Sequence, residues 1–149
     1  LGFCIDRLRQ LKALLPVAIL IENLDYNPTQ AYEYVCEPGF IQTVLKETDT
    51  GLLLDLAHAQ VTAHAFGVSV GDYISQLPLE KVRQIHLNRP GWREGRLVDA
   101  HLALETEDYA LLEQILSNCH PWAVTLEYNQ SHEKILDQIS RLRSILQKY

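Results

Sequence analysis

The sequence has no methionine, and its three cysteines, Cys4, Cys36 and Cys119, are far apart and odd in number. No two of them have the C-x-x-C spacing, so neither a zinc ribbon nor the disulfide framework of a small secreted protein is expected. A reducing cytoplasm is the simplest location for such a chain. Because the sequence contains no initiator methionine, we expect the chain to be trimmed, processed or a fragment of a longer protein.

Long apolar runs and clusters of basic residues are also absent. No apolar run approaches the roughly 20 residues that a membrane-spanning helix needs, and the N-terminus lacks the pattern of a signal peptide. The chain has 13 Lys and Arg against 19 Asp and Glu, which gives a formal net charge of -6. An acidic chain without a Lys/Arg run is poorly suited to nucleic-acid backbones. We therefore expect neither a membrane nor a nucleic acid as a partner.

Three common catalytic motifs are missing as well. The sequence contains no G-x-G-x-x-G, no Walker A motif and no G-x-S-x-G. Dinucleotide binding, P-loop chemistry and serine hydrolysis are therefore not expected. The composition, which is 47% hydrophobic and 21% charged, is typical of a globular domain that can bury a core.

Four short apolar runs recur along the chain, and stretches with helical spacing lie between them. Continuous apolar runs, without strict alternation, are typical of parallel strands buried on both faces. The runs cover residues 17–21, 51–54, 82–85 and 122–126, and the helical stretches cover 5–15, 40–45, 57–66, 70–77, 108–116 and 131–145, the last with Ser131 as its N-cap. The order predicts one α/β domain over residues 1–149, a (β/α)4 half of a TIM-type barrel with four parallel strands alternating with helices.

A half barrel has consequences for partners. A complete barrel needs about 250 residues and eight strands. A sheet of four strands leaves both edges open, and unpaired edge groups recruit other strands. We expect a second copy, a companion chain carrying the other half, or a rearranged element of this chain to complete the barrel.

Polar side chains stand at the end of every predicted strand. Glu22, Asp55, His86 and Glu127 each follow the apolar part of a strand, at the carboxyl end where ligands gather in parallel α/β folds. One such residue is commonly a helix cap or an exposed loop residue. Several carboxylates together without a cation would be destabilising, because a buried charge costs several kcal/mol unless it is paired. The pattern therefore predicts a metal site.

Further metal-ligand types follow in the adjoining segments. His58 comes three residues after Asp55 and either joins the site or is a helix-start or core histidine. Asp99 and His101 lie two apart, so in an extended segment they point the same way and either share an ion or pair with each other. A mixed set of imidazoles and carboxylates without a thiolate favours iron, manganese or zinc over copper sites with soft ligands.

The segment 88–96 is rich in arginine and contains Trp92. We expect a loop here after the third strand. The loop either forms a lid that holds an anionic or peptide substrate by charge-assisted hydrogen bonds, or is a solvated turn.

At this point the motifs resemble those of a known family. The segments 20–24, 53–58, 84–87, 99–101 and 126–127, with 67–78 between them, occur in the order and at about the spacing seen in multinuclear non-haem iron-dependent oxidative enzymes. This family includes the methanobactin-biosynthesis type, was long catalogued as a domain of unknown function, and has a xylose-isomerase-like TIM barrel. The resemblance covers the C-terminal half of that barrel.

The resemblance implies a fuller site and a chemistry. The metal ligands or their close neighbours would be Glu22, Asp55, His58, His86, Asp99, His101 and Glu127. Such enzymes use two or three irons and dioxygen to modify cysteine or nearby atoms of a peptide, commonly presented by a partner protein. Relatives also draw histidine ligands from the first half of the barrel.

The chain departs from the family pattern at three places. His58 stands where many relatives have Asn, the segment 88–90 replaces a small Gly-containing one, and 128–129 replaces a common Arg-Asp pair.

We therefore expect an iron-dependent oxidative enzyme, or its C-terminal half, acting on a peptide or small thiol. Two alternatives remain open from the residues: a divalent-metal isomerase or phosphoesterase of the same barrel superfamily, and a non-catalytic half-barrel scaffold that dimerises.

Overall fold

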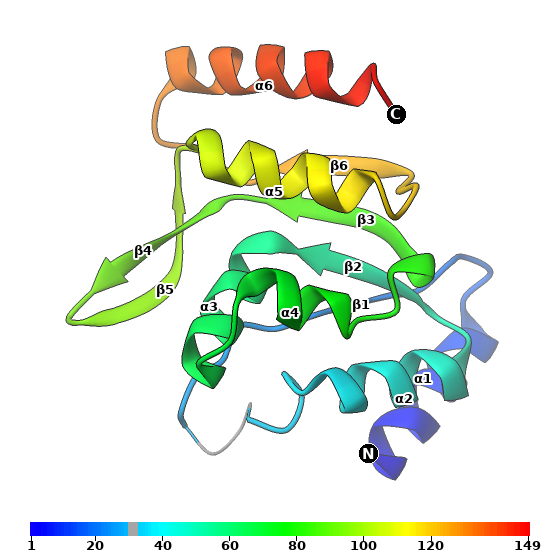
Figure 1. Ribbon diagram of the computed structural model, residues 1–149. Helices are drawn as coiled ribbons and strands as arrows, with labels where there is room; N and C mark the ends of the chain where they lie inside the picture. The colour runs from blue at the N-terminus through cyan, green and yellow to red at the C-terminus, as the bar shows by residue number, and fades with distance from the viewer. Residues whose placement is uncertain (30–32) are drawn as a thin grey trace.

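The computed structural model describes residues 1–29 and 33–149 of the chain. Its centre is a parallel sheet of four strands in the order β1-β2-β3-β6 (Figure 1). The strands are β1 (Leu20–Glu22), β2 (Gly51–Asp55), β3 (Val82–Leu87) and β6 (Ala123–Leu126). Since helices alternate with these strands, the structure confirms the predicted α/β half of a TIM-type barrel.

Helices connect the strands and cover the sheet. They are α1 (Gly2–Leu14), α2 (Pro38–Thr48), α3 (Leu56–Phe66), α4 (Val70–Ser75), α5 (Thr106–Leu116) and α6 (His132–Leu146), with a short 3-10 helix at Leu79–Lys81. The Ser131 hydroxyl accepts a hydrogen bond from the Lys134 amide, so the predicted N-cap of α6 is confirmed. None of the helices in the described part of the chain is long and apolar enough to cross a membrane.

The core lies between one face of the sheet and the helices. Alternate strand residues point to this face because successive side chains in a strand point to opposite sides. Leu52 and Leu54 of β2, with Ile85 and Leu87 of β3, are fully buried there against helix residues. The burial fixes the direction of each strand and hence the place where its carboxyl end emerges.

Two expectations on local structure were wrong. The first strand begins at Leu20, three residues later than the apolar run at Val17 suggested. The segment expected to be a loop after the third strand is an antiparallel hairpin of β4 (Arg89–Arg93) and β5 (Arg96–Leu102). Glu94 and Gly95 both have positive φ, 49° and 76°, as a two-residue hairpin turn requires. The turn was missed because Glu-Gly is a weaker signal than Asn-Gly or Asp-Gly.

The two edges of the sheet are formed by β1 and β6, so each of these strands has one side without a strand neighbour in the described residues. Exposed large apolar residues precede both edge strands along the chain, Val17 before β1 and Trp122 before β6.

We predict that the stability of the chain depends on the face of the sheet that the helices cover. Leu54→Ala should lower the free energy of unfolding by about 2–5 kcal/mol, because it leaves a cavity in a fully buried layer. Leu14→Ala is the control, since Leu14 is 78% exposed and should have little effect. Urea unfolding followed by circular dichroism measures both, and equal effects would contradict this picture of the core.

Candidate metal centre

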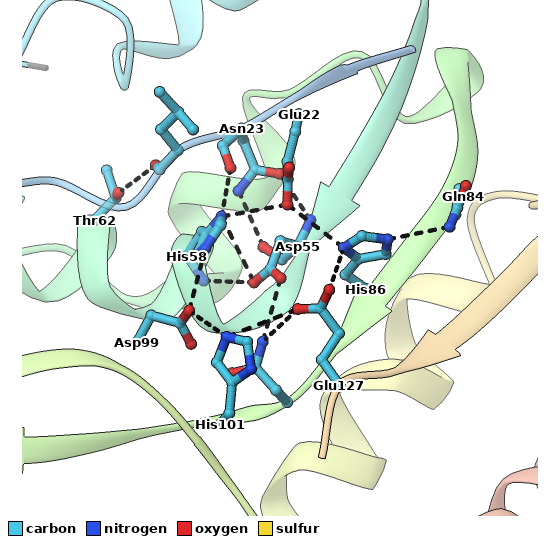
Figure 2. Close-up of polar contacts among 12 residues, drawn as sticks. Glu22, Asn23, Asp55, His58, Thr62, Gln84, His86, Asp99, His101 and Glu127 are labelled. Carbon is cyan, nitrogen blue, oxygen red and sulfur yellow. Dashed lines mark hydrogen bonds and ion pairs between the residues drawn. The ribbon is translucent and has the colours of Figure 1, made fainter. Parts of the chain in front are cut away.

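The carboxyl ends of the four strands converge on one cluster of polar side chains (Figure 2). Asp55 and His86 are register partners on β2 and β3, while Glu22 ends β1 and Glu127 directly follows β6. The parallel register thus places the four residues predicted at strand ends together at one end of the sheet.

One part of the cluster surrounds the ring of His86. Its Nδ1 atom lies 3.0 Å from Glu127 Oε1 and 3.5 Å from Glu22 Oε1. Candidate ligand atoms of Glu22, Asp55 and His86 all lie within 4.8 Å of one another. These separations are short enough for one ion to contact all three residues.

The other part of the cluster surrounds Asp99, which β5 carries. Its Oδ2 atom lies 2.7 Å from His101 Nε2 and 3.6 Å from His58 Nε2. Asp99 and His101 therefore pair with each other, and His58 joins them instead of standing apart. His101 Nε2 is also 4.0 Å from Glu127 Oε2. Glu127 thus lies between the two parts of the cluster, with one oxygen toward each.

The backbone at His101 is unusual. Its φ of 49° lies in the left-handed region, which non-glycine residues rarely occupy. Such strain costs about 1–3 kcal/mol and is typical of functional sites, where the surrounding contacts enforce it. Here it turns the imidazole toward Asp99 and Glu127.

Three buried polar atoms in the cluster have no hydrogen-bond partner among the described residues. They are His86 Nδ1, Asn88 Oδ1 and Asp99 Oδ1. His86 Nδ1 is close to two carboxylates, but neither carboxylate oxygen is in hydrogen-bonding geometry. An unpaired buried polar atom is costly, and in native proteins it commonly marks a bound ion or water.

Two asparagines that the sequence analysis did not single out hold the cluster together. Asn23, fully buried, donates from Nδ2 to the Asp55 carbonyl at 3.0 Å and accepts from the Asp55 amide at 2.9 Å. The Asn23 backbone carbonyl accepts a 2.8 Å hydrogen bond from His58 Nδ1. Asn88 Nδ2 donates to both Asp55 Oδ2 and Glu127 Oε2 at 3.3 Å. Their positions one or two residues beyond predicted ligands were the only available signal.

The charges of the cluster shift its titration. Burial raises the pKa of Asp55 to about 6, against the opposing effect of the neighbouring His58. For His58, burial acts to lower the pKa, but the carboxylates of Asp99 and Asp55 outweigh it and raise the value to about 9. Burial likewise opposes ionisation of Asp99, yet His58 and His101 hold its pKa below the usual value. The negative charge of Asp55 is therefore not fully compensated by the residues around it.

Residues 1–147 match the family described as RiPP precursor modification enzyme MbnB/TglH/ChrH. The chain belongs to this family. The match confirms the resemblance seen in the strand-end motifs, and with it the TIM-barrel-like fold class.

Curated relatives of this family are longer than the chain. A UPF0276 protein of Acaryochloris marina is 29% identical over 130 residues, 87% of this chain and 47% of that protein. A UPF0276 protein of Paraburkholderia phytofirmans is 29% identical over 130 residues, 83% of this chain and 42% of its own length. A third, of Psychromonas ingrahamii, is 30% identical over 115 residues, 74% and 38% of the two chains. The chain thus spans less than half the length of these relatives.

We predict that Asn23 stabilises the folded chain by holding the Asp55 backbone in place. Asn23→Ala removes two hydrogen bonds to the buried Asp55 backbone. The expected loss is about 2–4 kcal/mol of unfolding free energy. Asn118→Ala, which removes one exposed side-chain hydrogen bond, is the control and should cost less than about 1 kcal/mol. Urea unfolding compares the two, and a loss for Asn23→Ala no greater than the control would contradict this role of Asn23.

Proposed function

We propose that this chain provides the metal-binding strand ends of a non-haem iron enzyme that oxidatively modifies a peptide. The observation that carries the proposal is the buried Nδ1 atom of His86, which has no hydrogen-bond partner and faces the carboxylates of Glu22 and Glu127. An imidazole nitrogen in that position, with acidic oxygens around it, is suited to a cation as a common partner.

The donor set fits iron. The proposed ligands are Glu22, Asp55, His58, His86, Asp99, His101 and Glu127. Carboxylates and imidazoles without a thiolate suit iron, manganese and zinc, whereas soft-ligand metals prefer sulfur. Since Glu127 directs one oxygen to each part of the cluster, it is placed to bridge two ions.

Neighbouring residues set the orientation of the imidazoles. His58 donates from Nδ1 to the Asn23 carbonyl, so its Nε2 is the atom available toward Asp99. The Gln84 side-chain amide lies 3.1 Å from His86 Nε2. A metal on His86 Nδ1 requires a proton on Nε2. After a flip of the Gln84 amide group, its oxygen would accept a hydrogen bond from that Nε2–H group.

The substrate class comes from the family. Its description names enzymes that modify RiPP precursors, which are peptides, and we extend that class of substrate to this chain. Bound iron would supply redox chemistry with dioxygen. The residues of this chain would hold the metal and orient the imidazoles. All three cysteines are free thiols, which supports our proposal of a reducing, cytoplasmic location.

Iron binding tests the proposal directly. Protein prepared without oxygen and loaded with ferrous iron should retain roughly one equivalent or more, and iron should raise its unfolding temperature. Glu22→Gln combined with His86→Ala should abolish both effects, because it removes two groups that face the same site. Glu133→Gln combined with His132→Ala removes the same residue types from the exposed start of α6 and should change neither. Iron retention by the first variant equal to that of the wild type would refute the site.

We further propose that the complementary half of the barrel covers the two open edges. The exposed apolar residues that precede β1 and β6 would be buried by the remaining four β/α units. The relatives support this assignment, since more than half of their length lies outside the matched region. The other half, in the same polypeptide or a separate one, would also supply the ligands that this half lacks.

Coexpression with the unmatched half of the Acaryochloris marina relative tests this completion. We expect a complex of one copy of each, measured by analytical ultracentrifugation. Leu136→Glu places a charge on the exposed apolar side of α6 and should weaken the complex by about tenfold or more. Val68→Glu, at an exposed apolar residue between α3 and α4, is the control. A stable dimer of the chain alone that excludes the other half would contradict the proposal.

A further inference from the structure

The β4–β5 hairpin carries an arginine pair that the proposed metal centre does not use. Arg93 and Arg96 are direct register partners next to the turn, and both are exposed. Like charges opposite each other on a sheet repel and weaken the pairing. In the described part of the chain neither arginine has an ion-pair partner, whereas Arg89 contacts Glu105 and Asp108 at 2.9 and 3.1 Å.

One face of the hairpin contacts helix α3. Trp92 meets His64 of α3 edge to face, with ring centroids 5.1 Å apart, and Asp99 on the same face reaches His58. Because side chains alternate along a strand, the two arginines project from the opposite face. In Figure 1 the hairpin stands out from the sheet, so its outer end is reachable by a partner.

The arginine face also has an apolar part. A Cβ on Gly91 would lie 2.8 Å from Leu102 Cδ1 and 3.0 Å from the Ala100 Cβ, so Gly91, Ala100 and Leu102 share this face. Leu102 is 38% exposed and Val98 is half-buried. The face therefore presents an apolar strip that leads to two unpaired cations.

We infer that this face of the hairpin binds an acidic stretch of the peptide substrate. An extended peptide would lie along the apolar strip, and its carboxylates would form charge-assisted hydrogen bonds with Arg93 and Arg96. The rest of the chain is acidic, so the pair attracts an anionic segment to this place against the overall charge of -6. Asp99 projects from the opposite face of the same hairpin, so a single two-stranded element joins the arginine face to the cluster. The inference rests on the proposed function for the identity of the substrate.

A labelled peptide tests the inference. The probe is a fluorescein-labelled peptide of about ten residues with aspartate at every second position, and its counterpart has asparagine at those positions. Fluorescence anisotropy measures binding to the wild type and to Arg93→Gln combined with Arg96→Gln. Lys46→Gln combined with Arg143→Gln is the matched control, since it removes two exposed cations elsewhere.

The wild type and the control should bind the acidic peptide about tenfold more tightly than the hairpin variant does. Salt should weaken this binding, and the asparagine peptide should bind weakly to all three proteins. The hairpin variant should unfold at the same or a higher urea concentration than the wild type, because the substitutions relieve repulsion. Equal affinity of the wild type and the hairpin variant, equal affinity for the two peptides, or tighter binding of a single-stranded oligonucleotide to the same arginines would overturn the inference.

Iron content measured on the same samples separates this inference from the proposed function. The hairpin variant should retain as much iron as the wild type, since it changes none of the proposed ligands. Selective peptide binding by a protein that holds no iron would leave the inference standing and refute the proposed function. Iron binding without peptide selectivity would support the proposed function and refute the inference.

Discussion

The main physical constraint on this structure is that several carboxylates and imidazoles lie within a few ångströms of one another. Asp55 is fully buried among them, and burial of a carboxylate opposes its ionisation. The surrounding groups reduce that cost without removing it. Asn23 fixes the Asp55 backbone, Asn88 donates to the carboxylate, and His58 supplies a positive charge nearby. The arrangement is therefore rigid yet incompletely satisfied, as is expected of a site that binds a cation.

The same strands that build the core also hold this cluster in place. On β2, Leu52 and Leu54 point into the helix-covered core, and the strand ends at Asp55. The position of the carboxylate is thus set by the packing of leucines several ångströms away. Any slip in register would move apolar and polar residues together, so the stability of the core and the geometry of the site are linked.

The β4–β5 hairpin adds residues to the cluster from outside the four-stranded sheet. It brings Asp99 and His101 back over the strand ends and at the same time displays Arg93 and Arg96 at its outer end. The segment between β3 and α5 therefore adds one carboxylate and one imidazole to the cluster and two cations to the periphery. That separation is consistent with the proposal that the chain holds metal at one place and an anionic peptide segment at another.

From the amino acids alone we could predict the four parallel strands, the helices between them and the polar residue at the end of each strand. Those features are local, because apolar runs and helical spacing are imposed by whether a segment is buried on one face or two. The positions of Glu22, Asp55, His86 and Glu127 followed from this pattern. Their convergence did too, since parallel strands share one carboxyl end.

The β4–β5 hairpin and the contacts within the cluster could not be predicted in this way. The hairpin depends on pairing between two segments whose turn signal is weak, and the anchoring by Asn23 depends on β1 and β2 lying side by side. Whether Asp99 and His101 pair with each other, and whether His58 joins them, was open in the sequence and depends on distances between side chains from separate elements. Such contacts join residues far apart along the chain, and no local pattern of amino acids specifies them.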